Sequence, residues 1–244
     1  PWHRGYLLYA LTAAVPPDVD RADAPWLHTD AQRERALARA ERNDRVARQI
    51  ARRVQEAESL LEVSPIPPGE QSLHGNPNHM VHKGFKSQMR FRGPGRIWVD
   101  SERRYLSEDE LAELSEARHR AIGYEHHRYL SSGAHKLAVA WWLTGRTEFA
   151  EHARDILLAY AERYPQWPRT QPSSLAFSAK VGVAVLQESW WFRPMPLAFD
   201  LVRGSGVLTA EQDRRIVEGL MEPVAVTVRQ HRIEANQQAE ANAA

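Results

Sequence analysis

The second half of the chain limits the possible folds most, because helix-compatible segments follow one another there with only short connections. Apolar residues recur at helical spacing in four segments, and this predicts helices over 124–143, 147–164, 178–202 and 209–231. Pro194 and Pro196 are expected to interrupt the third of these helices. Gly145 and Pro165 end the first two, and a T-x-x-Q capping box begins the last at Thr209. Short connections place consecutive helices antiparallel, so we expect an all-α domain of helical hairpins arranged around a common axis.

The first half of the chain has a different character. Residues 30–62 have the periodicity of one amphipathic helix, and its polar face mixes arginines with glutamates as a solvated, salt-bridged surface does. Prolines and glycines then impose an irregular segment over 64–106, with short strands predicted around 89–91 and 97–99. An S-x-x-E capping box restarts the helices at Ser107. The sequence therefore predicts three parts, which are residues 1–63, 64–106 and 107–244.

Composition narrows the classes of function. The formal net charge is +1, with 32 basic and 31 acidic residues, so no global field attracts nucleic acid or a membrane surface. The absence of cysteine excludes a thiolate metal site and a cysteine nucleophile. No apolar run approaches the roughly 20 residues that cross a bilayer, and we therefore predict no membrane span.

Sequence patterns for metals and cofactors are missing as well. The chain has no G-x-S-x-G elbow, no phosphate-binding or dinucleotide-binding glycine loop and no H-E-x-x-H zinc helix. His74, His79 and His82 lie in the irregular segment without carboxylate ligands at a recognised spacing, and we interpret them as polar loop residues. We therefore expect neither a metal nor a cofactor.

One predicted helical segment carries side chains suited to a sugar. Its adjacent turns hold an amide, a carboxylate, an indole and a guanidinium, which belong to Gln187, Glu188, Trp190 and Arg193. Aromatic rings pack on the C–H faces of sugars and polar groups bind the hydroxyls, so these residues are candidates for a carbohydrate cleft. The alternative is that Trp190 and Trp191 are both part of the core and that Glu188 only pairs with Arg193.

Two further groups of side chains are candidates for chemistry. His126 and His127 could exchange a proton with a substrate, although structural, hydrogen-bonded histidines are the commoner case. Amides gather near the C-terminus at Asn236, Gln237, Gln238 and Asn242. A neutral amide donor can hold a substrate carboxylate without adding a titratable charge, whereas the alternative is a helix N-cap followed by solvated polar residues.

A family pattern emerges when these segments are taken in order. The segments are His126, LAVAWWLTG at 137–145, ARDILLAYAERYP at 153–165, LQESW at 186–190, AFDL at 198–201, Asn236-x-Gln238 and NAA at 242–244. Their order and spacing resemble the heparinase II/III-like and alginate lyase superfamily of polysaccharide lyases, over roughly residues 124–244.

The resemblance implies an incomplete (α/α) toroid and β-elimination at a uronic acid of an acidic polysaccharide. Asn236 matches the family's Asn that neutralises the uronate carboxylate, and Gln238 matches a supporting substrate contact. The family's Tyr and His acid/base groups, the rest of the toroid and a β-sandwich region lie further along, beyond Ala244. We therefore expect residues 1–244 to be inactive alone, and we favour a secreted or periplasmic location while a cytoplasmic one stays open.

Two other classes of function compete with a lyase. Toroids also support glycoside hydrolysis by two carboxylates, for which Glu188 and Asp200 are the nearest candidates. A non-catalytic helical scaffold that binds carbohydrate is the third possibility, and fold analogy alone does not separate the three.

Overall fold

The computed structural model describes residues 28–68, 89–99, 102–169, 179–182 and 185–229, and these residues are mostly helical. In chain order the elements are α2 (Asp30–Glu41), α3 (Asp44–Leu61), β1 (Met89–Phe91), β2 (Ile97–Val99), β3 (Arg104–Tyr105), α5 (Glu108–Ala112), α6 (Glu116–Thr144), α7 (Thr147–Arg163), the 3-10 turn η2 (Tyr164–Gln166), α8 (Val185–Phe192), α9 (Pro194–Arg203), α10 (Ala210–Ile216) and the π-helical turn η4 (Val217–Met221). Helix then continues over 222–229. The expectation of a mainly α-helical chain is confirmed.

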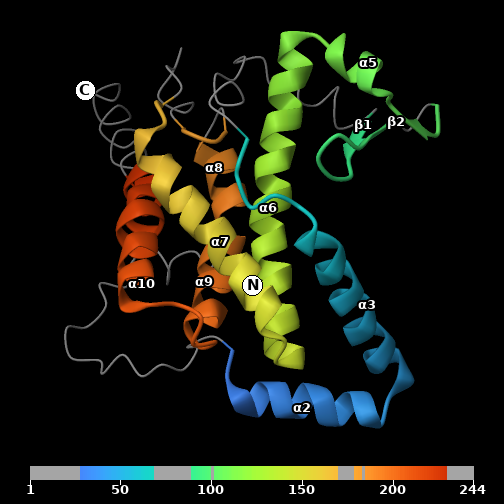
Figure 1. The fold of residues 1–244 in the computed structure, drawn as a ribbon, viewed down its shortest axis with the longest axis vertical. Coiled ribbons are helices and arrows are strands. Elements are labelled where there is room, and N and C mark those ends of the chain that lie inside the picture. Colours follow the sequence, from blue (N-terminus) through green and yellow to red (C-terminus); the bar gives the residue numbers. More distant parts are fainter. Residues whose placement is uncertain (1–27, 69–88, 100–101, 170–178, 183–184, 230–244) are drawn as a thin grey trace, which may run out of the picture.

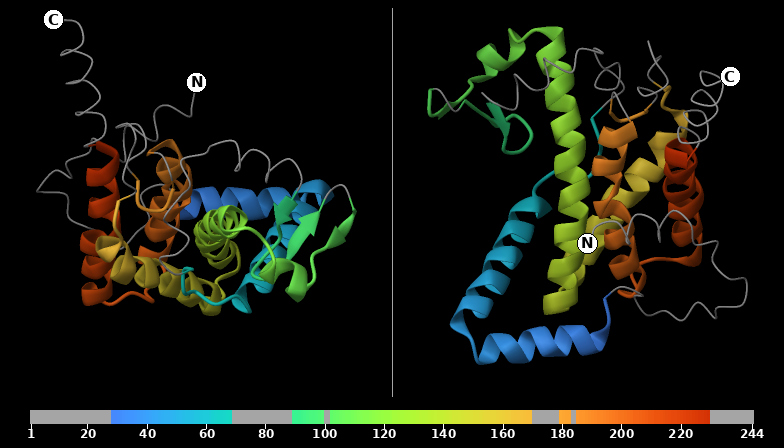
Figure 2. Two further views of the ribbon diagram at one scale, coloured as in Figure 1. Left: turned by 90° about the horizontal axis from the view of Figure 1, so that it is seen from above. Right: turned by 180° about the vertical axis from the view of Figure 1, so that it is seen from behind.

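The long helix α6 stands at the centre of the molecule. Helices α7, α8, α9 and α10 lie on one side of it, while α3 and the small sheet lie on the other (Figures 1 and 2). Gly145 ends α6 in the left-handed conformation, with φ 73°, as the sequence predicts. Most of the core lies where α6, α7 and α9 meet, around the fully buried side chains of Leu137, Leu157, Tyr160 and Leu201.

The amphipathic segment at 30–62 is two helices rather than the single helix predicted. Asn43 interrupts it, because its side chain accepts hydrogen bonds from the amides of Arg45 and Val46 and so caps a new helix. Helix α2 also begins with a capping box, between Thr29 and Gln32. The chain turns sharply between α2 and α3 (Figure 1).

The two short strands predicted in the irregular segment are confirmed, and a third strand extends them. The antiparallel sheet has the order β1-β2-β3, and Phe91 lies opposite Ile97. Ile97 and Val99 are buried against a small apolar cluster that includes Leu111 and Ile122. The sheet and α5 therefore form a lobe with its own apolar interior.

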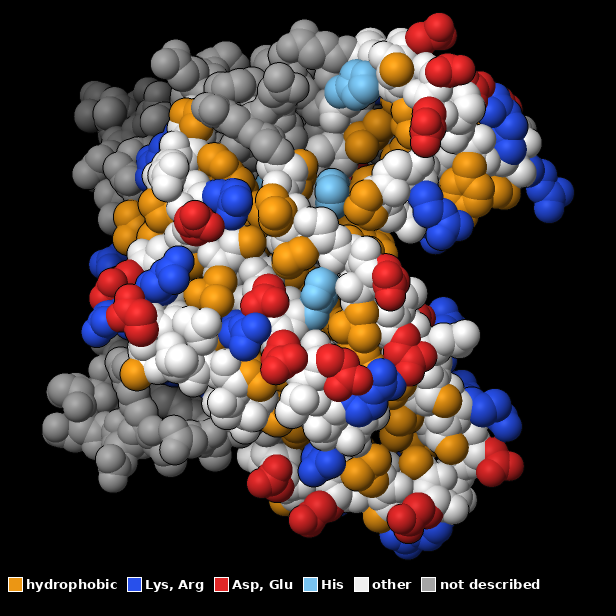
Figure 3. Space-filling view, in the orientation of Figure 1, with side chains coloured by type: hydrophobic (Ala, Val, Ile, Leu, Met, Phe, Trp, Pro, Cys, Tyr) orange, Lys and Arg blue, Asp and Glu red, His pale blue; other side chains and the backbone are white. Residues whose placement is uncertain are grey.

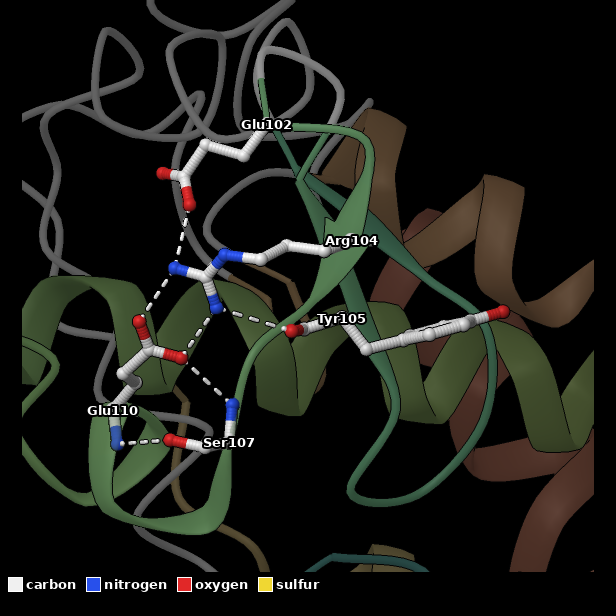
Figure 4. Close-up of polar contacts among 5 residues, drawn as sticks. All are labelled: Glu102, Arg104, Tyr105, Ser107 and Glu110. Atoms are coloured by element: carbon white, nitrogen blue, oxygen red, sulfur yellow. Dashed lines mark hydrogen bonds and ion pairs between the residues drawn. The ribbon is translucent and has the colours of Figure 1, made fainter.

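Within this lobe, an ion pair joins strand β3 to helix α5. Arg104 of β3 makes two parallel hydrogen bonds with the Glu110 carboxylate, at 2.7 and 2.6 Å, and it also pairs with Glu102 at 2.5 Å (Figure 4). Glu110 also completes the predicted capping box with Ser107. Arg104 and the Ser107 amide lower the pKa of Glu110 to about 2, so the pair stays ionised at neutral pH.

The last described helix has a π-turn where it approaches α7 most closely. A Cβ on Gly219 would lie 2.3 Å from the carbonyl oxygen of Ala161, so only glycine fits at this position. The predicted capping box between Thr209 and Gln212 is present at the start of α10.

The outer surface of the molecule has one recess in the view of Figure 3. It lies between the lobe that carries the sheet and the part formed by α3. Among the described helices, none combines the length and apolar character needed to cross a bilayer.

Candidate functional site

Helix α8 separates the predicted cleft residues into two faces. Gln187 and Glu188 are buried, with 3% and 0% of their surface exposed. Trp190 and Arg193 are exposed, and together with Leu186 they follow the i, i+4, i+7 spacing of one helix face. Trp191, the neighbouring indole, is fully buried. The outward face of α8 therefore offers an aromatic ring and a cation, while the inward face carries the polar network described next.

Glu188 is the centre of a buried hydrogen-bond network. The hydroxyl of Tyr164 lies 2.6 Å from its Oε1, and the amides of Val181 and Gly182 donate to its Oε2 at 2.8 and 3.1 Å. The carboxyl group thus joins α8 to the end of α7 and to the 179–182 segment. These three groups hold the carboxyl group, and the pairing of Glu188 with Arg193 considered from the sequence does not.

The protons in this network favour a neutral Glu188. Tyr164 has one hydroxyl proton but two close oxygens, because Thr227 Oγ1 lies 3.3 Å away and donates its own proton to the carbonyl of Pro223. A carboxylate at Glu188 would accept a hydrogen bond from the Tyr164 hydroxyl. No proton would then lie between the oxygens of Tyr164 and Thr227. A protonated Glu188 can donate to Tyr164, which then donates to Thr227. Burial raises the pKa of Glu188 in the same sense, against the opposing effect of its hydrogen bonds.

Lys180 closes the network on the side of α7. Its ammonium donates to the carbonyls of Tyr164 and Pro165, both at 3.0 Å, and lies 4.9 Å from the centre of the Tyr164 ring. It satisfies carbonyls that the end of the helix leaves free. Tyr164 and Lys180 were not singled out from the sequence, where the only signal was a tyrosine placed directly before the helix-ending Pro165.

His127 lies in an aromatic cluster behind this network. Its Nδ1 is 2.9 Å from the hydroxyl of Tyr160, and its exposed fraction is 0%. Burial, with a smaller effect from His126, lowers the pKa of His127 to about 3. The ring of Trp191 stacks on Tyr164 at 5.7 Å and also contacts Tyr160. His127 is therefore neutral at physiological pH and is enclosed by protein groups.

His126 occupies a different place, at the junction between α6 and the sheet. Its ring stacks on Phe91, with ring centres 5.4 Å apart. Burial lowers its pKa, and no group in the described part of the chain forms a hydrogen bond with its buried Nε2. The two histidines therefore lie in different environments, His127 beside Tyr160 and His126 beside the sheet. Neither shares a site with the exposed face of α8.

Thr227 links the helix over 222–229 to the Glu188 network. Asn236 and Gln238 follow that helix and lie outside the described residues, as do His74, His79 and His82. Asn236 is the ninth residue after Thr227, so the Cα atoms of the two can be at most about 30 Å apart.

Asp200 lies far from Glu188. His28 Nδ1 is 3.4 Å from the Asp200 carboxylate, and the His28 ring packs edge-on against Trp142 near the end of α6. Tyr124, near the other end of α6, donates to the carbonyl of Gln187 at 3.0 Å. Glu188 on α8 and Asp200 on α9 are twelve residues apart, and twelve residues of helix correspond to a rise of about 18 Å, above the roughly 5 to 9 Å between the carboxylates of a glycosidase.

The described residues contain no group of three or more histidines, aspartates or glutamates placed to hold a metal ion. Comparisons of the chain with protein-family models, with curated proteins and with solved structures find no match.

Proposed function

We propose that this chain carries the substrate-holding part of a polysaccharide lyase that cleaves a uronic-acid-containing polysaccharide by β-elimination within an incomplete (α/α) toroid. Asn236 holds the uronate carboxylate and so lowers the cost of removing the adjacent proton. Gln238, Trp190 and Arg193 contact the sugar. The tyrosine and histidine that exchange protons come from the part of the toroid that follows, and the β-sandwich region lies beyond them.

The observation that carries the proposal is the contact of Tyr164 with both Glu188 and Thr227. It fixes α8, which presents Trp190 and Arg193, beside the helix that leads to Asn236. A neutral Glu188 in this position orients the surrounding elements without repelling an anionic substrate. In this proposal Glu188, Gln187 and His127 support the site through positioning, and His126 supports it at the junction with the sheet.

The experiment measures binding of a short oligogalacturonate to the 244-residue chain by calorimetry. We expect binding that a neutral oligosaccharide does not reproduce, and a loss of about tenfold or more in Asn236→Ala, because a hydrogen bond to a charged group contributes roughly 1.5 to 3 kcal/mol. Asn78→Ala is the matched control, with the same change of side chain at a position outside the C-terminal group of amides.

Equal affinities of the two variants for the uronate would contradict the proposal. Formation of unsaturated, ultraviolet-absorbing products by the 244-residue chain would refute the part that places the acid/base groups elsewhere. Release of saturated reducing ends would indicate hydrolysis instead, for which Glu188 and Asp200 do not supply a facing pair.

A further inference from the structure

The outer face of the small sheet combines two aromatic rings with an arginine. Ile97 and Val99 face the apolar interior of the lobe, so the alternation along β2 places Trp98 on the opposite face. Tyr105 lies directly across from Trp98, and the two rings meet edge to face at 5.2 Å. The guanidinium of Arg96 lies 4.9 Å from the centre of the Tyr105 ring and donates to its hydroxyl at 3.3 Å.

A second arginine stands opposite Arg96 at the end of the hairpin. The amide of Arg92 donates to the carbonyl of Arg96 at 2.9 Å, which makes the two residues a cross-strand pair. The Cβ atoms of such a pair are about 5 Å apart, and like charges placed directly opposite destabilise a sheet. No carboxylate in the described part of the chain forms an ion pair with either one. The hairpin thus holds two neighbouring positive charges that no carboxylate among the described residues neutralises.

Arg104, in the same sheet, differs from Arg92 and Arg96 because its charge is paired. Arg104 belongs to the same sheet, yet two carboxylates neutralise it, those of Glu102 and Glu110 (Figure 4). That arginine joins the sheet to α5. Arg96 also contacts a neighbouring strand, through the ring and hydroxyl of Tyr105 on β3, but no carboxylate among the described residues neutralises either Arg96 or Arg92. Their charge is therefore available to a ligand.

Contacts on the inner face of the hairpin hold the whole hairpin, including its outer face, against α6. Phe91 packs against the rings of His126 and Tyr129 on α6, with ring centres 5.4 and 5.5 Å apart. Tyr105 keeps 41% of its surface exposed on the other side. A platform that is already ordered loses less conformational entropy when it binds a partner.

We propose that the outer face of the β1–β3 sheet is a second binding site for an acidic sugar chain, separate from the α8 site. Arg92 and Arg96 hold a carboxylate or sulfate, and a sugar ring packs on Tyr105 beside Trp98. The choice of a uronate polymer as the ligand rests on the proposed function. The charge pair and the aromatic platform rest on the sheet alone.

The test is a titration of the 244-residue chain with polygalacturonate at low ionic strength, followed by calorimetry. We expect Arg92→Ala/Arg96→Ala to weaken binding by about tenfold, since two charge contacts are lost together. Arg45→Ala/Arg48→Ala is the matched control, because it removes the same net charge from exposed positions on α3. This control should change affinity by no more than about twofold. Tyr105→Phe should keep most of the affinity, whereas Tyr105→Ala should lose it.

Three results would overturn the inference: no binding by the unmodified chain, equal losses in the two double variants, or equally tight binding of an oligothymidylate that competes with the uronate. The melting temperature of Arg92→Ala/Arg96→Ala should stay the same or rise, since the variant removes a like-charge pair, and this separates lost binding from lost folding. If Asn236→Ala has no effect on uronate binding while the sheet variant retains its effect, the proposed function fails and the sheet site stands.

Discussion

Replacement of Glu188 by glutamine is predicted to have little effect on stability, although this carboxyl group is completely buried. A glutamine can accept from the amides of Val181 and Gly182 through its carbonyl oxygen and donate to Tyr164 through its amide. It reproduces the hydrogen-bond pattern of a protonated glutamic acid, so we expect a cost within about 1 kcal/mol at pH 7. An alanine leaves three partners without this group, and at about 1 to 2 kcal/mol for each we expect a loss of roughly 3 to 6 kcal/mol.

The dependence on pH follows from the same proton. Burial raises the pKa of Glu188 in the folded chain, so the folded state holds a proton that the unfolded state has already released above its ordinary pKa. The contribution of this group to stability is therefore complete at low pH and is lost as pH rises through the folded pKa. Relative to Glu188→Gln, the unmodified chain should lose stability as pH increases from about 4.5, the ordinary pKa of this carboxyl group, toward neutral pH.

Urea unfolding followed by circular dichroism measures both effects. The unmodified chain, Glu188→Gln and Glu188→Ala are compared at several pH values within this range. A loss of more than about 3 kcal/mol in Glu188→Gln at pH 7 would refute a neutral Glu188, because it would show that the negative charge is what the donors stabilise. A stability that rises with pH relative to Glu188→Gln would refute it independently.

Three further comparisons, each made by urea unfolding, test the packing and the acid sensitivity of the described residues. Gly219→Ala should destabilise the chain by about 2 to 4 kcal/mol, because its Cβ meets the Ala161 carbonyl. Gly133→Ala, a helical control whose Cβ would have ordinary contacts, should be neutral or stabilising, and equal effects would contradict the predicted close approach. Trp191→Ala should cost about 3 to 5 kcal/mol and Trp190→Ala less than about 1, since only Trp191 is fully buried; a reversed order would contradict the assignment of the two faces of α8. His135→Phe should remove part of the acid sensitivity, because burial, with His28 and Arg53, lowers the pKa of His135 to about 4. His135 gains a proton below about pH 6.5 in the unfolded chain, but not in the folded one. The free energy of unfolding of the unmodified chain therefore falls by about 2 kcal/mol through this group by pH 5. An unchanged dependence of stability on pH in the variant would exclude this explanation.

Local signals in the sequence predicted much of the fold. The capping boxes at Ser107 and Thr209, the stop at Gly145 and the strands at 89–91 and 97–99 all appear in the structure. Each depends on a few neighbouring residues, which is why sequence alone was sufficient. The break at Asn43 was missed because the charged and apolar periodicity continues on both sides of it, and that pattern outweighed a single capping residue.

Features set by long-range packing could not be predicted in this way. Adjacent tryptophans 190 and 191 have similar intrinsic preferences, and only the positions of Tyr160 and Tyr164 on α7 decide which one is buried. Glu188 was identified from the sequence as a polar candidate, but its partner Tyr164 lies 24 residues before it in the chain. Tyr164 in turn contacts Thr227, which lies well beyond Glu188 in the sequence. The break predicted at Pro194 in the helix over 178–202 is confirmed, since α8 ends at Phe192 and α9 begins at Pro194. Residues 179–182 are not helical, however, and the amides of Val181 and Gly182 bind the Glu188 carboxyl group.

The central claim is that Asn236 and the exposed face of α8 bind the same uronate. Nuclear magnetic resonance can follow the side-chain amide of Asn236 and the indole N–H of Trp190 in one titration with a short oligogalacturonate. We predict that both signals shift with a common dissociation constant, and that a neutral oligosaccharide moves neither in the same way. A shift of the Trp190 signal while the Asn236 amide stays unchanged would contradict the account.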